Sequence, residues 1–170
     1  MGAGGQGATE GSGGSPGPSS RRYGAFKTEA GVRAWLKREA DAVWWVENKR
    51  GGTAGFPDAI VSFRGVLMFF ELKLAEGRRF KAAPAQINLV RQLRKFGHPA
   101  FIVGGVAGTR NLWAAEPEMV KRVGSSSGAG RRVVYETGAF SVESESGQFM
   151  HEIHAVVRGV KKPSSMKTRG

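Results

Sequence analysis

Two stretches of the chain carry apolar residues at helical spacing. The first begins after Thr28, whose side chain suits an N-cap, and its apolar positions are Val32, Trp35, Leu36, Ala40 and Val43. The second begins at Pro84, a residue favoured in a first turn, and ends before Gly97, which suits a C-terminal cap. Its apolar positions are Ile87, Val90, Leu93 and Phe96. The pattern therefore predicts two amphipathic helices.

Between these helices the apolar runs are rich in β-branched and aromatic side chains. Residues 43–46 form a short run of this kind, and residues 58–63 and 66–73 form two longer runs on either side of Arg64-Gly65. Two such runs joined by so short a segment predict a β-hairpin with a tight turn. Residues 99–103 form a further apolar run after the second helix. The expected order is helix, three-strand meander, helix, strand.

The pairing of the expected hairpin brings two acidic residues together. If residues 64 and 65 form a two-residue loop, the pairing continued outward places Asp58 directly opposite Glu71. Opposed side chains have Cβ atoms about 4.5–5.5 Å apart, where like charges destabilise a sheet. A divalent cation with oxygen ligands would neutralise them. Because side chains alternate along a strand, Lys73 is expected on the same face as Glu71.

The charged residues of the second hairpin strand lie among apolar neighbours, which are Phe69, Phe70, Leu72 and Leu74. These neighbours indicate a strand that is covered on both faces, where charged side chains are rarely placed without partners. The alternative is an ordinary hairpin with charges paired across its surface, and the apolar neighbours disfavour it.

The motif Pro57-Asp58…Glu71-x-Lys73 resembles that of the PD-(D/E)xK nuclease superfamily. Within it, the lead-in Gly55-x-Pro57-Asp58 and the helix start Pro84-x-Gln86 are most similar to the VRR-NUC group and to Holliday-junction resolvases. The resemblance covers roughly residues 28–106 and not the tails. It implies an α/β (α+β) fold with a restriction-endonuclease-like αβββαβ core, in which helices flank a mixed sheet.

The resemblance also implies Mg²⁺ as cofactor, with Mn²⁺ as a substitute. Asp58, Glu71 and the carbonyl of Leu72 would bind the metal, which keeps several water ligands. Glu29, in the first turn of the first helix, matches an acidic residue of many relatives and would reach the metal directly or through water. An acidic residue there is equally consistent with a favourable interaction with the helix dipole.

Two further residues would act beside the metal. Lys73 would orient or deprotonate the attacking water, or hold a phosphate oxygen. Gln86 would bind a catalytic water or a phosphate at the start of the second helix, where the helix N-terminus favours an anion. The alternative for Gln86 is a solvated first-turn residue. Trp44 and Trp45 are interpreted as core residues in preference to base-stacking groups.

The composition of the chain indicates a polyanionic binding partner. The chain of 170 residues has a formal net charge of +12. Basic residues that could meet DNA phosphates lie on either side of the hairpin, and they are Lys49, Arg50, Arg78, Arg79 and Lys81. A membrane surface is the rival partner, but we find no apolar run of about 18 residues. The N-terminus lacks a secretory signal, and without cysteine there is no thiolate site, so a cytoplasmic location is expected, the host-cell cytoplasm if the protein is viral.

The expected organisation has five parts. Residues 1–22 are a Gly/Ser-rich flexible tail, 23–123 the nuclease domain, 124–130 a linker, 131–160 a β-rich extension and 161–170 a basic tail. Within them, residues 116–121 are expected to form a short helix, and residues 133–135 and 149–154 one or two strands.

The leading functional hypothesis is a Mg²⁺-dependent endodeoxyribonuclease of DNA recombination or repair, acting on branched or junction DNA. The preference for branched DNA and a possible homodimer come from the resemblance alone. Alternatives are a restriction-like or end-processing nuclease on linear DNA, a non-catalytic nucleic-acid-binding protein, and a virion or packaging component. The lack of cysteine and the tail would suit a phage protein.

Overall fold

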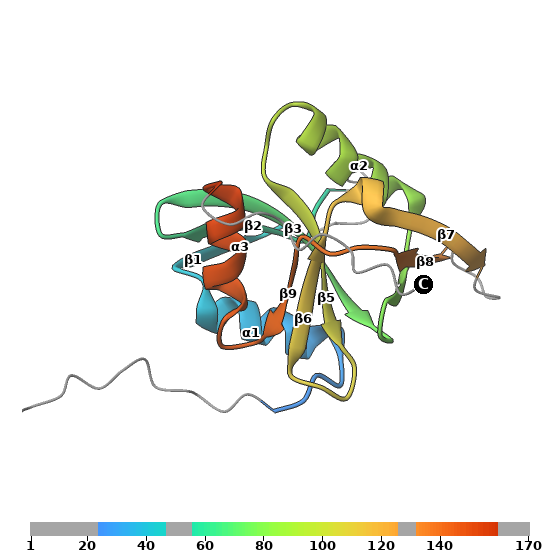
Figure 1. Ribbon diagram of the computed structural model, residues 1–170, viewed down its shortest axis with the longest axis horizontal. Coiled ribbons are helices and arrows are strands. Elements are labelled where there is room, and N and C mark those ends of the chain that lie inside the picture. The colour runs from blue at the N-terminus through green and yellow to red at the C-terminus, as the bar shows by residue number, and fades with distance from the viewer. Residues whose placement is uncertain (1–23, 47–55, 126–131, 160–170) are drawn as a thin grey trace, which may run out of the picture.

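A computed structural model describes residues 24–46, 56–125 and 132–159 of the chain (Figure 1). Its elements in order are α1 (Glu29–Glu39), β1 (Ala42–Trp45), β2 (Ala59–Phe63), β3 (Val66–Ala75), β4 (Arg79–Ala82), α2 (Pro84–Lys95), β5 (Ala100–Val106), β6 (Asn111–Ala115), the 3₁₀ turn η1 (Pro117–Met119), β7 (Val120–Ser125), β8 (Val133–Thr137), β9 (Val142–Glu145) and α3 (Phe149–Val157). The strands form a six-stranded sheet in the order β1-β2-β3-β5-β6-β9 and a three-stranded sheet in the order β4-β8-β7.

The larger sheet is mixed, because β3 and β5 are parallel and its other neighbours are antiparallel. The α+β fold and the αβββαβ order of the core are therefore confirmed, with β4 inserted between β3 and α2. Thr28 caps α1 as expected, since its hydroxyl oxygen accepts a hydrogen bond from the Gly31 amide at 3.1 Å. No helix among the described residues is long and apolar enough to cross a membrane.

The central hairpin has the register that the sequence predicts. Arg64 and Gly65 form the turn with φ angles of 47° and 76°, and positive φ at both central residues is what a type I′ turn requires. Phe63 accordingly pairs with Val66, and the ladder continues without a slip to the pair Ala59 and Phe70. The next position outward brings Asp58 toward Glu71.

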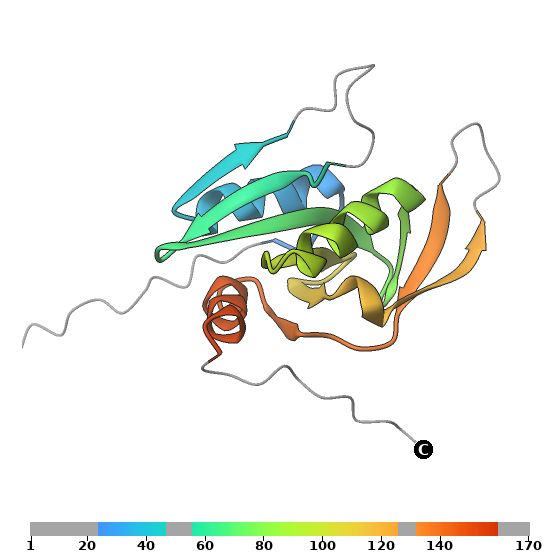
Figure 2. The same ribbon diagram turned by 90° about the horizontal axis from the view of Figure 1, so that it is seen from above.

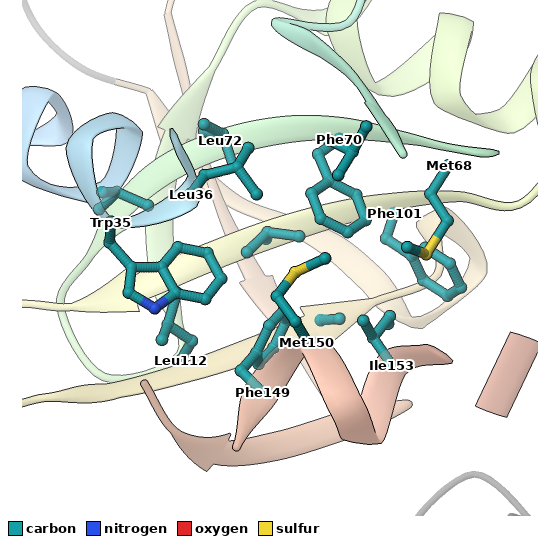
Figure 3. Packing of buried hydrophobic residues seen from close by; sticks show 14 of the residues in the cluster. Trp35, Leu36, Met68, Phe70, Leu72, Phe101, Leu112, Phe149, Met150 and Ile153 are labelled. Carbon is teal, nitrogen blue, oxygen red and sulfur yellow. The ribbon is translucent and has the colours of Figure 1, made fainter. Parts of the chain in front are cut away.

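The helices lie on opposite faces of the larger sheet, so β3 is covered on both (Figures 1 and 2). On one face, α1 and α3 pack on alternate residues of β3, which are Met68, Phe70 and Leu72 (Figure 3). On the other face, Ile87 and Val90 of α2 pack with Ile102 of β5 in a second cluster that extends into the small sheet. Glu71 and Lys73 belong to the α2 face, because they alternate with the residues that α1 covers.

Two elements after residue 75 differ from the expectation. Strand β4 was not predicted from the sequence, and it forms because Phe80 and Ala82 alternate with exposed residues and are buried. Residues 149–154 lie in helix α3 and not in a strand. Phe149 and Ile153 are one helical turn apart and both fully buried, and burial at this spacing favours a helix over a strand.

The segment around residue 120 also differs from the expectation. Only Pro117–Met119 form a 3₁₀ turn, and Val120 already begins β7. Gly124 and Ser125, expected in the linker, are the last residues of this strand because they pair with β8. Predicted strand residues 133–135 are confirmed within β8. The predicted tails, residues 1–22 and 161–170, and the rest of the linker lie outside the described residues.

Candidate metal centre

Asp58 is placed against β3 by the backbone of that strand. It follows Pro57 and immediately precedes β2, and its Oδ2 accepts a hydrogen bond from the Leu72 amide at 2.9 Å. This bond holds the carboxylate beside the residue that precedes Leu72, which is Glu71. The Asp58 side chain is 9% exposed.

Glu71 is a fully buried carboxylate with an ion pair but without an aligned hydrogen bond from the described residues. Lys73 Nζ lies 2.7 Å from its Oε1 and forms an ion pair with it. This contact lacks the alignment of a hydrogen bond, and neither Oε1 nor Oε2 accepts an aligned one from the described part of the chain. Buried polar atoms almost always have such partners. The two oxygens are therefore available for a further positive ligand.

Gln86 reaches the same group from the start of α2. Ala83, the N-cap residue, has no side-chain acceptor, and Gln86 folds back so that its Oε1 accepts from the Ala83 amide at 3.0 Å. The same oxygen accepts from Lys73 Nζ at 3.3 Å. Lys73 is thus held between Glu71 and Gln86. The contacts join four of the residues selected from the sequence, Asp58, Glu71, Lys73 and Gln86.

Arg33 is a member of this site that the sequence analysis missed. Its Nη2 lies 2.9 Å from Asp58 Oδ1, on the opposite side of the carboxylate from the Leu72 amide. Its guanidinium also lies 5.1 Å from the centre of the Trp45 ring. The only sequence signal was its place one helical turn after Glu29, and that spacing does not tell which strand the side chain meets.

The donor set suits a hard divalent cation. Two carboxylates converge, one of them with both oxygens unmatched, and oxygen ligands are those that Mg²⁺ prefers. No group of three or more acidic, histidine or cysteine side chains that could hold a metal ion occurs among the described residues. Glu29 therefore does not complete such a group with Asp58 and Glu71. Its contact through water, and the contact of the Leu72 carbonyl, stay predictions.

The protonation of Glu71 reflects this environment. Burial raises the pKa of Glu71 from 4.5 to about 7, the ion pair with Lys73 opposes that rise, and the nearby Asp58 carboxylate adds to it. The metal-free site therefore takes up a proton near neutral pH, and a cation would displace it.

This pKa predicts how stability depends on pH without metal. The folded state binds the Glu71 proton more tightly than the unfolded chain, so stability falls as pH rises from 4.5 to about 7. Between pH 5 and pH 8 in EDTA, wild type should lose roughly 3 kcal/mol more unfolding free energy than Glu71→Gln. Urea unfolding at both pH values measures this difference. Equal pH dependence in the two proteins would show that Glu71 is ionised throughout.

Three of the five basic residues selected from the sequence lie on or beside the small sheet. The Arg78 guanidinium packs 5.0 Å from the centre of the Phe140 ring. Arg79 and Lys81 are exposed on the outer side of β4, where Arg79 Nε lies 3.5 Å from a carboxylate oxygen of Glu136. Lys49, Arg50 and the lead-in Gly55 lie outside the described residues.

The interpretation of the two tryptophans was correct for one of them only. Trp45 is partly buried and packs against the core that α1 covers. Trp44 points to the opposite face and is 53% exposed. The reason is that β1 is an edge strand and α2 packs on β3 and β5, so the described residues leave Trp44 open to solvent.

Comparison with known proteins shows little similarity. No protein-family model matches the chain, and no curated protein matches it. Among solved structures, Hjc, a Holliday junction resolvase of the archaeal hyperthermophile Archaeoglobus fulgidus, superposes with a TM-score of 0.45 and 14% sequence identity. The match covers 64% of this chain and 85% of that one. Similarity this low says nothing about activity.

Proposed function

We propose that this protein is a metal-dependent nuclease that hydrolyses phosphodiester bonds in DNA. The observation that carries the proposal is the fully buried Glu71 carboxylate, which lies beside Asp58 and forms an ion pair with Lys73. Neither of its oxygens accepts an aligned hydrogen bond from the described residues. A buried carboxylate kept without hydrogen bonds is costly unless a ligand compensates it. A hairpin with a purely structural role would not require a carboxylate at this buried position.

The residues around the carboxylates would position the attacking water and the phosphate. The metal, when bound, would supply an activated water and neutralise charge on the phosphate. Lys73 Nζ can donate to that water or to a phosphate oxygen from its position between Glu71 and Gln86. Gln86 holds Lys73 there, and the N-terminus of α2 favours a phosphate beside it.

DNA is the proposed substrate because the chain carries a formal charge of +12, which suits a polyanion. The preference for branched DNA and the homodimer expected from the resemblance belong to the same proposal. The test is incubation of the purified protein with fluorescent four-way junction, duplex and single-stranded DNA in Mg²⁺, Mn²⁺ or EDTA. We expect cleavage in both metals and none in EDTA. No cleavage of any DNA, or full cleavage in EDTA, would refute the proposal.

Replacing Arg33 should change the Mg²⁺ concentration that cleavage requires. Its guanidinium competes with a cation for Asp58 Oδ1, so Arg33→Gln should lower the Mg²⁺ concentration for half-maximal cleavage. Because the Arg33 side chain is 39% exposed, the effect should be small, about two- to fivefold. A Mg²⁺ titration of the cleavage rate measures it, with Lys37→Gln, an exposed residue of the same helix, as control. An unchanged midpoint would mean that Arg33 moves away before the metal binds.

Arg79 and Lys81 are expected to contribute to DNA affinity and not to the rate of cleavage. Each lost phosphate contact lowers the slope of log K against log salt by about 0.9 on duplex DNA. The double variant Arg79→Ala/Lys81→Ala should therefore bind more weakly with a shallower slope, and cut at a near-normal rate when saturated. The control is Lys37→Ala/Arg110→Ala, which removes two exposed charges elsewhere. Equal slopes in the two variants would place the DNA away from β4.

A further inference from the structure

An apolar strip lies exposed at one end of the larger sheet. Trp44 of β1 is 53% exposed and Leu67 of β3 is 50% exposed. Between them lie Ile60 of β2 and Phe69 of β3, both partly exposed. We call these four residues the apolar strip. Large apolar side chains gathered on a surface are typical of a binding site.

The strand pairing puts this strip on the same face as the candidate metal centre. Trp44 pairs with Ile60, and Ile60 pairs with Phe69, so the three side chains lie in one row across the sheet. Phe69 precedes Glu71 by two residues on β3 and therefore shares its face. Two strand spacings and two residues along the strand separate Trp44 from Glu71, which is roughly 12 Å between Cα atoms.

The helices explain why the strip is open. Helix α2 packs over β3 and β5, and α1 packs on the opposite face of the hairpin. In Figure 2 the green α2 lies to one side of the cyan β1. Neither core cluster includes Trp44 or Ile60, whereas Phe69 packs against the cluster to which α2 contributes. Glu71 lies two residues further along β3 from Phe69.

We propose that Trp44 is a stacking platform for an unpaired nucleobase of the DNA strand whose phosphate is held at Glu71 and Lys73. The inference rests on the proposed nuclease function and names its substrate class, which is DNA with unpaired bases next to the cut. A base in a duplex has both faces covered by its neighbours, whereas an unpaired base can leave the stack and meet an aromatic ring.

Charge and distance favour a nucleobase over a protein as the occupant. The chain has a formal net charge of +12, which attracts nucleic acid. A strand with a phosphate at Glu71 also carries bases within one or two nucleotides of Trp44. Proteins that bind single strands combine a positive groove with such aromatic platforms.

The binding test separates stacking from charge by changing both the protein and the DNA. Affinity is measured in EDTA, where no cleavage occurs, for a duplex with a short single-stranded gap, the same gap built from abasic nucleotides, and a fully paired duplex. Trp44→Ala should weaken binding to the gapped DNA about fivefold to a hundredfold. Binding to the abasic gap and the duplex should not change, and Trp44→Phe should restore most of the loss.

Two additional measurements complete the test. Phe96→Ala removes a side chain that does not belong to the strip and is 76% exposed at the C-cap of α2, and it should leave every affinity unchanged. Trp35 and Trp113 are buried, and Trp45 is partly buried against the core on the opposite face of the sheet. The intrinsic fluorescence of the wild type should therefore be quenched by the gapped DNA mainly through Trp44. This quenching should largely disappear in Trp44→Phe.

Three results would overturn the proposal. One is equal loss of affinity for the gap with and without bases, and another is no loss in Trp44→Ala. The third is a shift from dimer to monomer in Trp44→Ala during sedimentation with unchanged DNA binding, which would assign the strip to a second copy. Wild-type cleavage in Mg²⁺ is measured in parallel, so failure of the nuclease function is seen independently of Trp44.

Discussion

Replacing Glu71 by glutamine should lower the rate of DNA cleavage by about a thousandfold or more. The change removes one of two converging carboxylates, and with it the charge that holds the divalent cation and displaces its competing proton. Glutamine has nearly the same shape, and the folded protein no longer has to ionise a buried acid. Single-turnover cleavage under saturating protein measures the rate, and circular dichroism confirms that the fold persists.

Asp58→Asn should behave in the same way, because Asp58 supplies the second carboxylate. The matched control is Glu118→Gln, an exposed acidic residue of the 3₁₀ turn outside the site, and it should cut at the wild-type rate. Wild-type cleavage by either Glu71→Gln or Asp58→Asn would contradict the assignment of the metal centre to this pair.

Lys73→Ala should reduce turnover by about a hundredfold to ten-thousandfold, the range for loss of a positioned proton donor or acceptor. DNA affinity should change little, because Lys73 is one positive charge among the 26 lysine and arginine residues of the chain. Its ion pair with Glu71 and its hydrogen bond to Gln86 fix its amino group at the carboxylates, where only the reacting phosphate would need it. Single-turnover rates and equilibrium binding in EDTA, measured on the same DNA, separate the two effects.

The control for Lys73 is Lys95→Ala, which removes an exposed lysine from the last turn of α2. It should leave both rate and affinity unchanged. If Lys73→Ala lost affinity in proportion to rate, the lysine would be an anchor for a phosphate and would have no separate part in the reaction.

The arrangement of the hairpin could be predicted from the sequence because its determinants are local. A two-residue turn sets the register, and the period of two then decides which side chains share a face. The approach of Asp58 to Glu71 and the position of Lys73 follow from these rules alone. The start of α2 was readable for a similar reason, since Pro84 and Gln86 lie within a single helical turn.

Features that depend on packing between distant elements could not be predicted. Arg33 contacts Asp58 because of the position at which α1 packs on the hairpin. Trp44 is exposed because α2 packs on β3 and β5 and does not extend over β1. Helix α3 was mistaken for a strand because a short apolar run has no reliable period of its own. Its buried Phe149 and Ile153 find their partners on strands far earlier in the chain.

The claim that Asp58 and Glu71 hold a divalent metal is tested most directly by anomalous diffraction from a crystal of the wild-type protein soaked in Mn²⁺. We predict an anomalous peak between the two carboxylates, within about 2.2 Å of an oxygen of each, since Mn²⁺ takes the same oxygen ligands as Mg²⁺. The peak should be absent from crystals of Glu71→Gln. An empty site in the wild type, with Mn²⁺ bound elsewhere in a protein that still cuts DNA, would contradict this claim.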